Sequence, residues 1–326
     1  MFIRFFKFNS PSAYIFLPLI AIAIWVGAMA STTVFSDKHV MPLFYLVSQL
    51  IKTPWLSCLI AFLFIVAEAF LLNFIVNENE ILNKQSFLPA LLYLVFMSNN
   101  INLLVLHPLV FSNLFILFAI NKLISSYRKD VVFSQAFDAG FLISIASLFY
   151  FPSIIFLLLL VVGFILFRPF NWREWMISFL GAVVPYLFVL MYYFWNNSLS
   201  TFFYDTILFP LLSYKTRMEI SESFYFTIVI ALIIIFFSFV KLMGGLTGGS
   251  QKSKKGIVLF VWTLIFSGLS IFLAPEISTI TLSVSAIPLS VFCANYFLNL
   301  KKGWFAEMLF LLFIGSIFYN LIEYFF

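Results

Sequence analysis

The chain has 326 residues, of which 63% are hydrophobic and only 10% are charged, and its mean hydropathy is +1.10. Its 18 basic and 13 acidic residues are too few to cover the surface of a soluble protein of this length, whereas a bilayer accepts an apolar exterior. The composition excludes a soluble globular protein. The net charge of +5 is spread over short connections rather than gathered on one face, so it does not indicate a nucleic-acid partner.

Glycine, proline and charged residues divide the sequence into apolar segments that predict membrane helices. A membrane helix needs roughly 20 residues, so about eleven spans account for nearly the whole chain and make residues 1–326 a single transmembrane domain. The third and fifth segments are too short to cross alone, and we expect paired, kinked or broken helices there. The predicted spans are residues 13–30, 55–76, 87–97, 103–120, 138–150, 152–167, 176–195, 224–243, 257–273, 277–297 and 304–324.

Basic residues in the connections predict the orientation. With a cytoplasmic N-terminus, fourteen basic residues fall inside and four, Lys38, Lys52, Lys215 and Arg217, fall outside. The positive-inside rule then favours a multi-pass protein of the bacterial inner membrane with a cytoplasmic N-terminus and a periplasmic C-terminus. We expect residues 13–30 to remain as a span, although the basic residues before them mimic a cleavable signal peptide.

The first outer segment, residues 31–54, contains Asp37, Lys38 and His39. An aspartate at the level of the lipid headgroups suits a general base acting on an acceptor hydroxyl, while neighbouring cations hold a lipid phosphate. The alternative is an ordinary solvated loop. The segment continues in a short amphipathic stretch that we expect along the outer membrane surface, with Leu43, Val47 and Leu50 on one side and Tyr45, Gln49 and Lys52 on the other.

The second outer segment, residues 196–223, alternates apolar anchors with polar residues that include Tyr214, Lys215 and Arg217. With only four basic residues on this side, we expect this segment to fold back over Asp37 and to supply cations for an anionic lipid headgroup. The alternative is that Lys215 and Arg217 pair with acidic residues of their own loop.

Few side chains within the membrane could carry chemistry. Glu68 lies near the middle of its span, where an ionised carboxylate is costly, so it is a functional candidate; the alternative is a neutral acid bonded to a neighbouring helix. Two histidines, His39 and His107, are too few for a metal centre, and His107 is interpreted as a hydrogen-bonded residue at the head of a helix. Cys58 and Cys293 are expected to be buried thiols without a disulfide.

Three strings carry a resemblance to a known family: LPALLYL (residues 88–94), FDAGFLISIASLFYFPS (residues 137–153) and LFRPFNWREW (residues 166–175). They are similar to an uncharacterised family of polytopic inner-membrane proteins from Bacteroidota, and the similarity covers almost the full chain.

The order of features also resembles, more distantly, the GT-C glycosyltransferases, which take sugars from polyprenyl-phosphate carriers at the outer face. Those enzymes have an acidic residue after the first span and an interfacial helix in that first outer loop. Asp37 and residues 43–52 hold these places here, although Lys38 follows Asp37 where many members have a second acid. The resemblance implies layout rather than a shared catalytic motif.

The sequence therefore predicts an all-α membrane bundle with a GT-C-like layout that binds or acts on an isoprenoid-linked sugar at the periplasmic face. Asp37 is the expected catalytic base. No cofactor or metal is expected besides a polyprenyl-phosphate-linked sugar as substrate. Whether the chain is an enzyme stays open, because two alternatives fit: a non-catalytic membrane subunit that contacts envelope proteins, and a small-solute transporter that uses Glu68. The residues expected to bind substrate are Lys38, His39, Lys52, Glu68, Tyr214, Lys215 and Arg217.

Overall fold

The described residues of the computed structural model are 5–7, 11–29, 40–82, 84–99, 103–168, 170–208, 229–230, 232–238, 250–274, 279–300 and 303–325, and they form helices and connections without a strand. The all-α class is thereby confirmed. The α-helices are α2 (Pro11–Met29), α3 (Pro42–Leu50), α4 (Pro54–Glu78), α5 (Leu88–Met97), α6 (Pro108–Ser125), α7 (Phe133–Phe149), α8 (Leu157–Phe167), α9 (Trp172–Trp195), α10 (Leu199–Thr201), α13 (Gln251–Ser270), α14 (Thr279–Leu282), α15 (Ala286–Asn299) and α16 (Gly303–Phe325). Tighter or wider helical turns extend several of them: η2 (Phe151–Phe156), η3 (Phe202–Leu208), η4 (Ile271–Leu273) and η5 (Ser283–Ser285).

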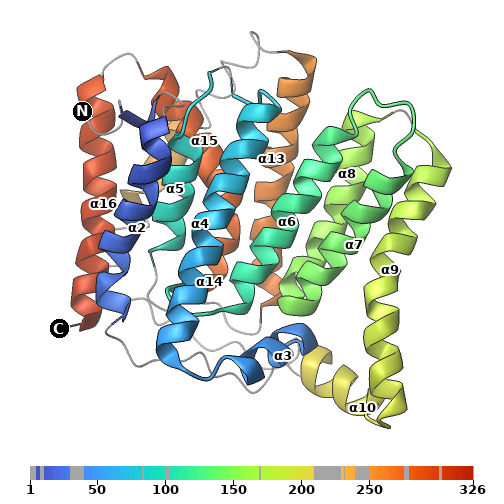
Figure 1. Cartoon of the computed structure of the whole chain (residues 1–326). Helices are drawn as coiled ribbons and strands as arrows, with labels where there is room; N and C mark the ends of the chain where they lie inside the picture. The colour runs from blue at the N-terminus through green and yellow to red at the C-terminus, as the bar shows by residue number, and fades with distance from the viewer. Residues whose placement is uncertain are drawn as a thin grey trace.

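The long helices run side by side and alternate in direction (Figure 1). Helices α2 and α16 form one edge of the bundle, α9 forms the other, and α4, α5, α6, α13 and α15 lie between them. The connections after α4, α6 and α8 lie at the upper end of Figure 1, whereas α3 and α10 lie across its lower end. These two ends are called the upper and the lower end below.

The length and composition of the helices identify a membrane protein. Among the described residues, five helices are long and apolar enough to cross a bilayer: Pro54–Glu78, Pro108–Ser125, Trp172–Trp195, Gln251–Leu273 and Ile280–Asn299. Large apolar side chains on their outer faces are exposed, among them Phe188 at 71% and Trp195 at 81%, as a lipid-facing surface requires. The remaining apolar helices are shorter, so the number of eleven spans stays a prediction.

Helix starts follow from proline and from capping side chains. Pro42, Pro54 and Pro108 each stand in the first turn of a helix, where the missing N–H costs no hydrogen bond. His107 caps α6, because its Nδ1 accepts a hydrogen bond from the backbone N–H of Leu109 at 3.1 Å. Proline and this cap set the start of α6 at residue 108, five residues after the start of the predicted span 103–120.

Helices α7 and α9 approach closely because each presents a glycine to the backbone of the other. A Cβ atom added at Gly140 would overlap the carbonyl oxygen of Ser178, and one added at Gly181 would overlap that of Phe137. Small residues at such positions let helix backbones pack in a membrane, where the hydrophobic effect does not drive association. The string FDAGFLISIASLF therefore marks a helix contact. Helix α7 begins at Phe133, five residues before the predicted span 138–150.

Candidate functional site

Glu68 lies in α4, the longest of the described helices, and its side chain is completely buried, with 0% exposure. The residue is the fifteenth of the 25 in this helix, so it lies about 21 Å from the start of α4 at 1.5 Å per residue. An ionised carboxylate at such a depth must be paired, be neutralised or face water. Its neighbours therefore decide what Glu68 can do.

Two neighbouring helices supply the polar partners of Glu68. The hydroxyl of Tyr93 in α5 donates a hydrogen bond to Glu68 Oε2 at 2.8 Å. The amide Nδ2 of Asn113 in α6 donates to the Tyr93 hydroxyl at 3.4 Å and to the sulfur of Met97 at 3.7 Å. All four side chains are 0% exposed. We call Glu68, Tyr93, Met97 and Asn113 the central polar cluster.

Two oxygen atoms of the central polar cluster have no hydrogen-bond partner. They are Glu68 Oε1 and Asn113 Oδ1. An unpartnered buried acceptor is costly, and native structures hold few of them. Both atoms are hydrogen-bond acceptors, so each could take a hydrogen bond from a donor that enters the cluster.

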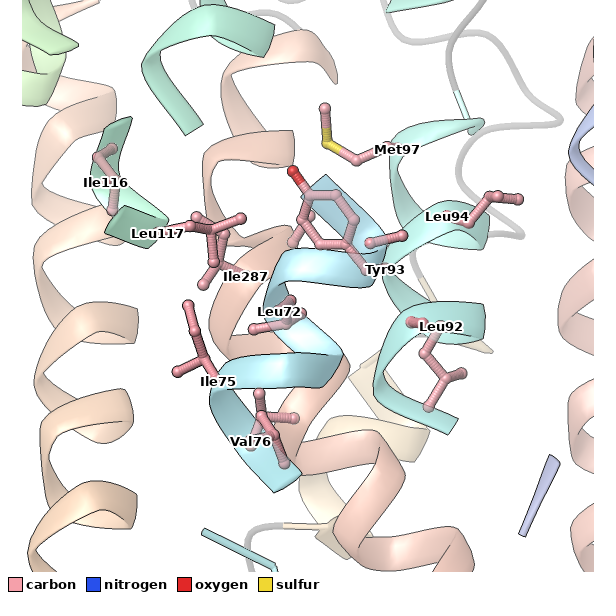
Figure 2. Close-up of a cluster of buried hydrophobic side chains, with 14 of the residues drawn as sticks. Leu72, Ile75, Val76, Leu92, Tyr93, Leu94, Met97, Ile116, Leu117 and Ile287 are labelled. Carbon is pink, nitrogen blue, oxygen red and sulfur yellow. The ribbon is translucent and has the colours of Figure 1, made fainter. Parts of the chain in front are cut away.

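Apolar side chains of three helices lie around the ring of Tyr93. Figure 2 shows the ring of Tyr93 projecting from α5 among Leu72 of α4, Leu117 of α6 and Ile287 of α15. These three side chains are at most 1% exposed. Because the surroundings are apolar, the electrostatic interactions of the carboxyl are weakly screened.

Helix α5, which carries Tyr93 and Met97, is only ten residues long and is almost entirely buried. At 1.5 Å per residue it spans about 15 Å, roughly half of the hydrocarbon thickness. Ser98 ends it: its hydroxyl donates to the carbonyl of Leu94 at 2.7 Å and accepts from Trp25 Nε1 at 3.3 Å. The prediction of a short helix over residues 87–97 is confirmed, and the central polar cluster lies beside the end of this half-length helix.

The predicted catalytic base, Asp37, and most residues predicted to bind substrate lie outside the described part of the chain. The latter are Lys38, His39, Tyr214, Lys215 and Arg217, so their expected meeting with Asp37 stays a prediction. Lys52 is exposed at the lower end, just before α4 begins. Lys52 and Glu68 are therefore separated by more than half the length of α4, and the structure does not bring them together.

Helix α3 forms within the predicted amphipathic stretch. Phe44 is its buried residue and packs against Phe111 of α6, with ring centroids 6.3 Å apart. Leu50, expected on the apolar side with Leu43 and Val47, is 82% exposed at the end of the helix. The helix contacts the bundle through Phe44, which the sequence analysis did not single out, and through Val47.

A second buried acid was missed by the sequence reasoning. Glu174 at the upper end is 2% exposed, and Arg168 binds both of its carboxylate oxygens, Nη2 to Oε1 at 2.7 Å and Nε to Oε2 at 3.2 Å. Asn171 Nδ2 donates to Oε1 at 3.3 Å, and Asn171 Oδ1 caps α9 by accepting from the N–H of Arg173. Arg168 also donates to the carbonyls of Lys129 and Asp130. The string LFRPFNWREW thus ties α8, α9 and the α6–α7 connection together.

The described part of the chain contains no set of side chains that could bind a metal ion. No group of three or more His, Cys, Asp or Glu side chains is close enough there to hold a metal ion. Cys58 and Cys293 are both buried free thiols. His107 is occupied as the cap of α6.

The family to which the chain belongs follows from its sequence. Residues 39–325 match the model of a family of unknown function, DUF6427. The chain belongs to this family. No curated protein and no solved structure matches the chain. The family match names neither an organism group nor an activity, so the resemblances to Bacteroidota proteins and to GT-C enzymes stay predictions.

Proposed function

We propose that this DUF6427 protein moves a small solute or ion across the bacterial inner membrane and that Glu68 takes up and releases the proton or cation that drives the movement. The observation that carries the proposal is the central polar cluster, in which a fully buried carboxyl has one oxygen without a partner. Ionisable residues inside membrane helices commonly mark ion pathways and proton relays.

The half-length helix α5 supports the same proposal. Transporters place substrate and coupling-ion sites near the bilayer midplane, beside helices that are interrupted there. Helix α5 ends at Met97, and Met97 and Tyr93 both belong to the cluster. A change in the packing of this short helix would alter the partners of Glu68 directly. Coupling between proton binding and solute movement requires an element with two arrangements, and we propose α5 for that part.

A rapid pH step on proteoliposomes adsorbed to a solid-supported electrode tests the proposal without a known substrate. We expect a transient charge displacement with the native protein and its loss in Glu68→Gln, which keeps the shape of the side chain. The matched control is Glu80→Gln, because Glu80 is exposed after the end of α4. Equal currents from the native protein and Glu68→Gln would contradict the proposal.

We propose also that the upper end of the bundle lies in the cytoplasm. Described basic residues support it, since they lie in the connections and adjoining helix turns that Figure 1 places at this end: Lys122, Arg128, Lys129, Arg168, Arg173, Lys252, Lys254 and Lys255. In a chain without Cys58 and Cys293, a cysteine at Asn196 should react with a membrane-impermeant maleimide in intact spheroplasts. A cysteine at Lys254 should react only after permeabilisation. The reverse pattern would invert the orientation.

A second candidate function is glycosyl transfer from an isoprenoid-linked sugar at the periplasmic face. The specific observation in its favour is α3, which lies across the lower end of the bundle with Leu46 and Leu50 exposed, as a helix at a membrane surface would. In this proposal Asp37 is the general base. Asp37→Asn should then abolish transfer from a polyprenyl-phosphate sugar without lowering expression. Full activity in that variant would exclude the base.

A further inference from the structure

A cavity of about 430 Å³ lies between α2 and α4, near the upper end of α4. Its apolar wall consists of Tyr14 from α2 and Phe70 and Phe74 from α4. Tyr14 is 47% exposed and Phe74 is 54% exposed, so the cavity opens at the side of the bundle. Phe74 belongs to α4, which is long and apolar enough to cross the membrane. A molecule that enters here would come from the lipid phase.

The polar lining of this cavity consists of amides and one carboxylate, whose oxygens accept hydrogen bonds. Asn73 is 3% exposed and lines the cavity, and its Oδ1 has no hydrogen-bond partner. Glu78 and Gln85, both exposed, line it as well and add a carboxylate and a second amide. No basic side chain belongs to the described lining. An amide oxygen and a carboxylate require a donor from the ligand.

Helix α4 itself adds negative potential at this place. Glu78 is its last residue, and no basic residue stands in its last turn. The carbonyl end of a helix carries a partial negative charge that favours a cation. Aromatic faces attract cations too. The negative potential and the hydrogen-bond acceptors thus favour the same ligand group, a cation that carries N–H donors.

The cavity is held in shape by contacts that do not depend on a ligand. Asn77 binds the backbone of Ser86 in both directions, Nδ2 to the carbonyl at 3.0 Å and Oδ1 from the N–H at 3.2 Å. This pair holds the connection that carries Gln85 against α4. Phe87 packs on both Tyr14, at 4.6 Å between ring centroids, and Phe70, at 5.8 Å. The site is therefore preformed.

We infer that this cavity binds the headgroup of a phospholipid with a primary ammonium, of the phosphatidylethanolamine type. The ammonium has three N–H donors for Asn73 Oδ1, the Glu78 carboxylate and the Gln85 amide oxygen. The acyl chains then follow the exposed faces of Tyr14 and Phe74. Full N-methylation keeps the charge of the headgroup but removes every donor, so phosphatidylcholine should bind poorly. The inference is independent of the proposed transport function.

Native mass spectrometry of the delipidated full chain, titrated with either lipid at matched acyl chains, tests the inference. We expect phosphatidylethanolamine to bind at least about fivefold more tightly than phosphatidylcholine. Asn73→Leu and Glu78→Gln should each bring that ratio close to one, whereas Glu80→Gln, just beyond α4 and outside the described lining, should leave it unchanged.

Three results would overturn the inference. The first is equal binding of the two lipids by the native chain. The second is an unchanged preference in both Asn73→Leu and Glu78→Gln, each shown to be folded by its unfolding temperature. The third is displacement of the lipid by free ethanolamine at a similar concentration, which would identify a soluble amine as the ligand.

Discussion

Two buried glutamates of this bundle have opposite surroundings. Glu174 at the upper end accepts hydrogen bonds on both carboxylate oxygens, from Arg168 and from Asn171. Glu68 in the middle of α4 accepts one from Tyr93 on Oε2, and its Oε1 has no partner. Burial is nearly the same, 2% and 0% exposure, so burial alone does not distinguish their roles.

The two carboxylates differ in how many of their oxygen atoms have hydrogen-bond partners. A bidentate arginine pair holds the Glu174 carboxylate and joins α8 to α9. Among the described residues, Glu68 has no cation as a hydrogen-bond partner, and its neighbours are apolar. The proposed role in transport therefore falls to Glu68, whereas the contacts of Glu174 explain a structural role.

The largest expected change in the free energy of unfolding follows from removal of Arg168 at the upper end. Arg168→Ala leaves Glu174 buried without its cation and removes the bonds to the α6–α7 connection. Removal of one partner from a buried ion pair costs about 3–5 kcal/mol, and we expect this loss of unfolding free energy. Unfolding in mixed micelles of rising SDS fraction measures it. A loss below about 1 kcal/mol would show that the pair does not join the helices.

A smaller loss of unfolding free energy is expected when the hydroxyl that donates to Glu68 is removed. Tyr93→Phe takes away the hydroxyl that binds Glu68 Oε2 and accepts from Asn113. A buried polar group that loses its partner costs about 1–3 kcal/mol. The double variant Glu68→Leu with Tyr93→Phe should recover most of this loss, because neither polar group then remains. If the double variant were less stable than Tyr93→Phe alone, the polar side chains of the cluster would be stabilising the fold.

The smallest effect is expected for Glu68→Gln. The amide keeps the shape of the acid and an oxygen for the Tyr93 hydroxyl, so stability should change by less than about 1 kcal/mol. Glu174→Gln is the matched variant and should cost clearly more, because the charge-assisted pair with Arg168 is lost. The same SDS titration compares the two. Equal losses would remove the distinction between the two acids.

The burial of Glu68 and the short helix α5 could be predicted from the sequence. Glu68 stands alone in a long apolar run, so its burial and its candidacy follow from composition. The short helix around Leu88–Met97 follows from the length of its apolar segment. Tyr93 could not be identified as its partner, because a tyrosine in an apolar run is usually another core residue and the contact joins residues 25 positions apart.

Other parts depend on packing that a single sequence does not show. The face of α3 that meets the bundle carries Phe44, because the neighbouring Phe111 decides which side of a short helix is covered. Arg168 and Glu174 offered a signal, opposite charges six positions apart around the helix-capping Asn171. Spacing alone could not show that both side chains are buried in the same place.

Proton exchange by Glu68 is tested most directly by an infrared difference spectrum of the reconstituted protein between acidic and alkaline buffer. We expect a carbonyl band of a protonated carboxyl that disappears as the pH rises, shifts in D₂O and is absent from Glu68→Gln but present in Glu80→Gln. A native spectrum identical to that of Glu68→Gln over the whole pH range would contradict it, since Glu68 would then exchange no proton with water.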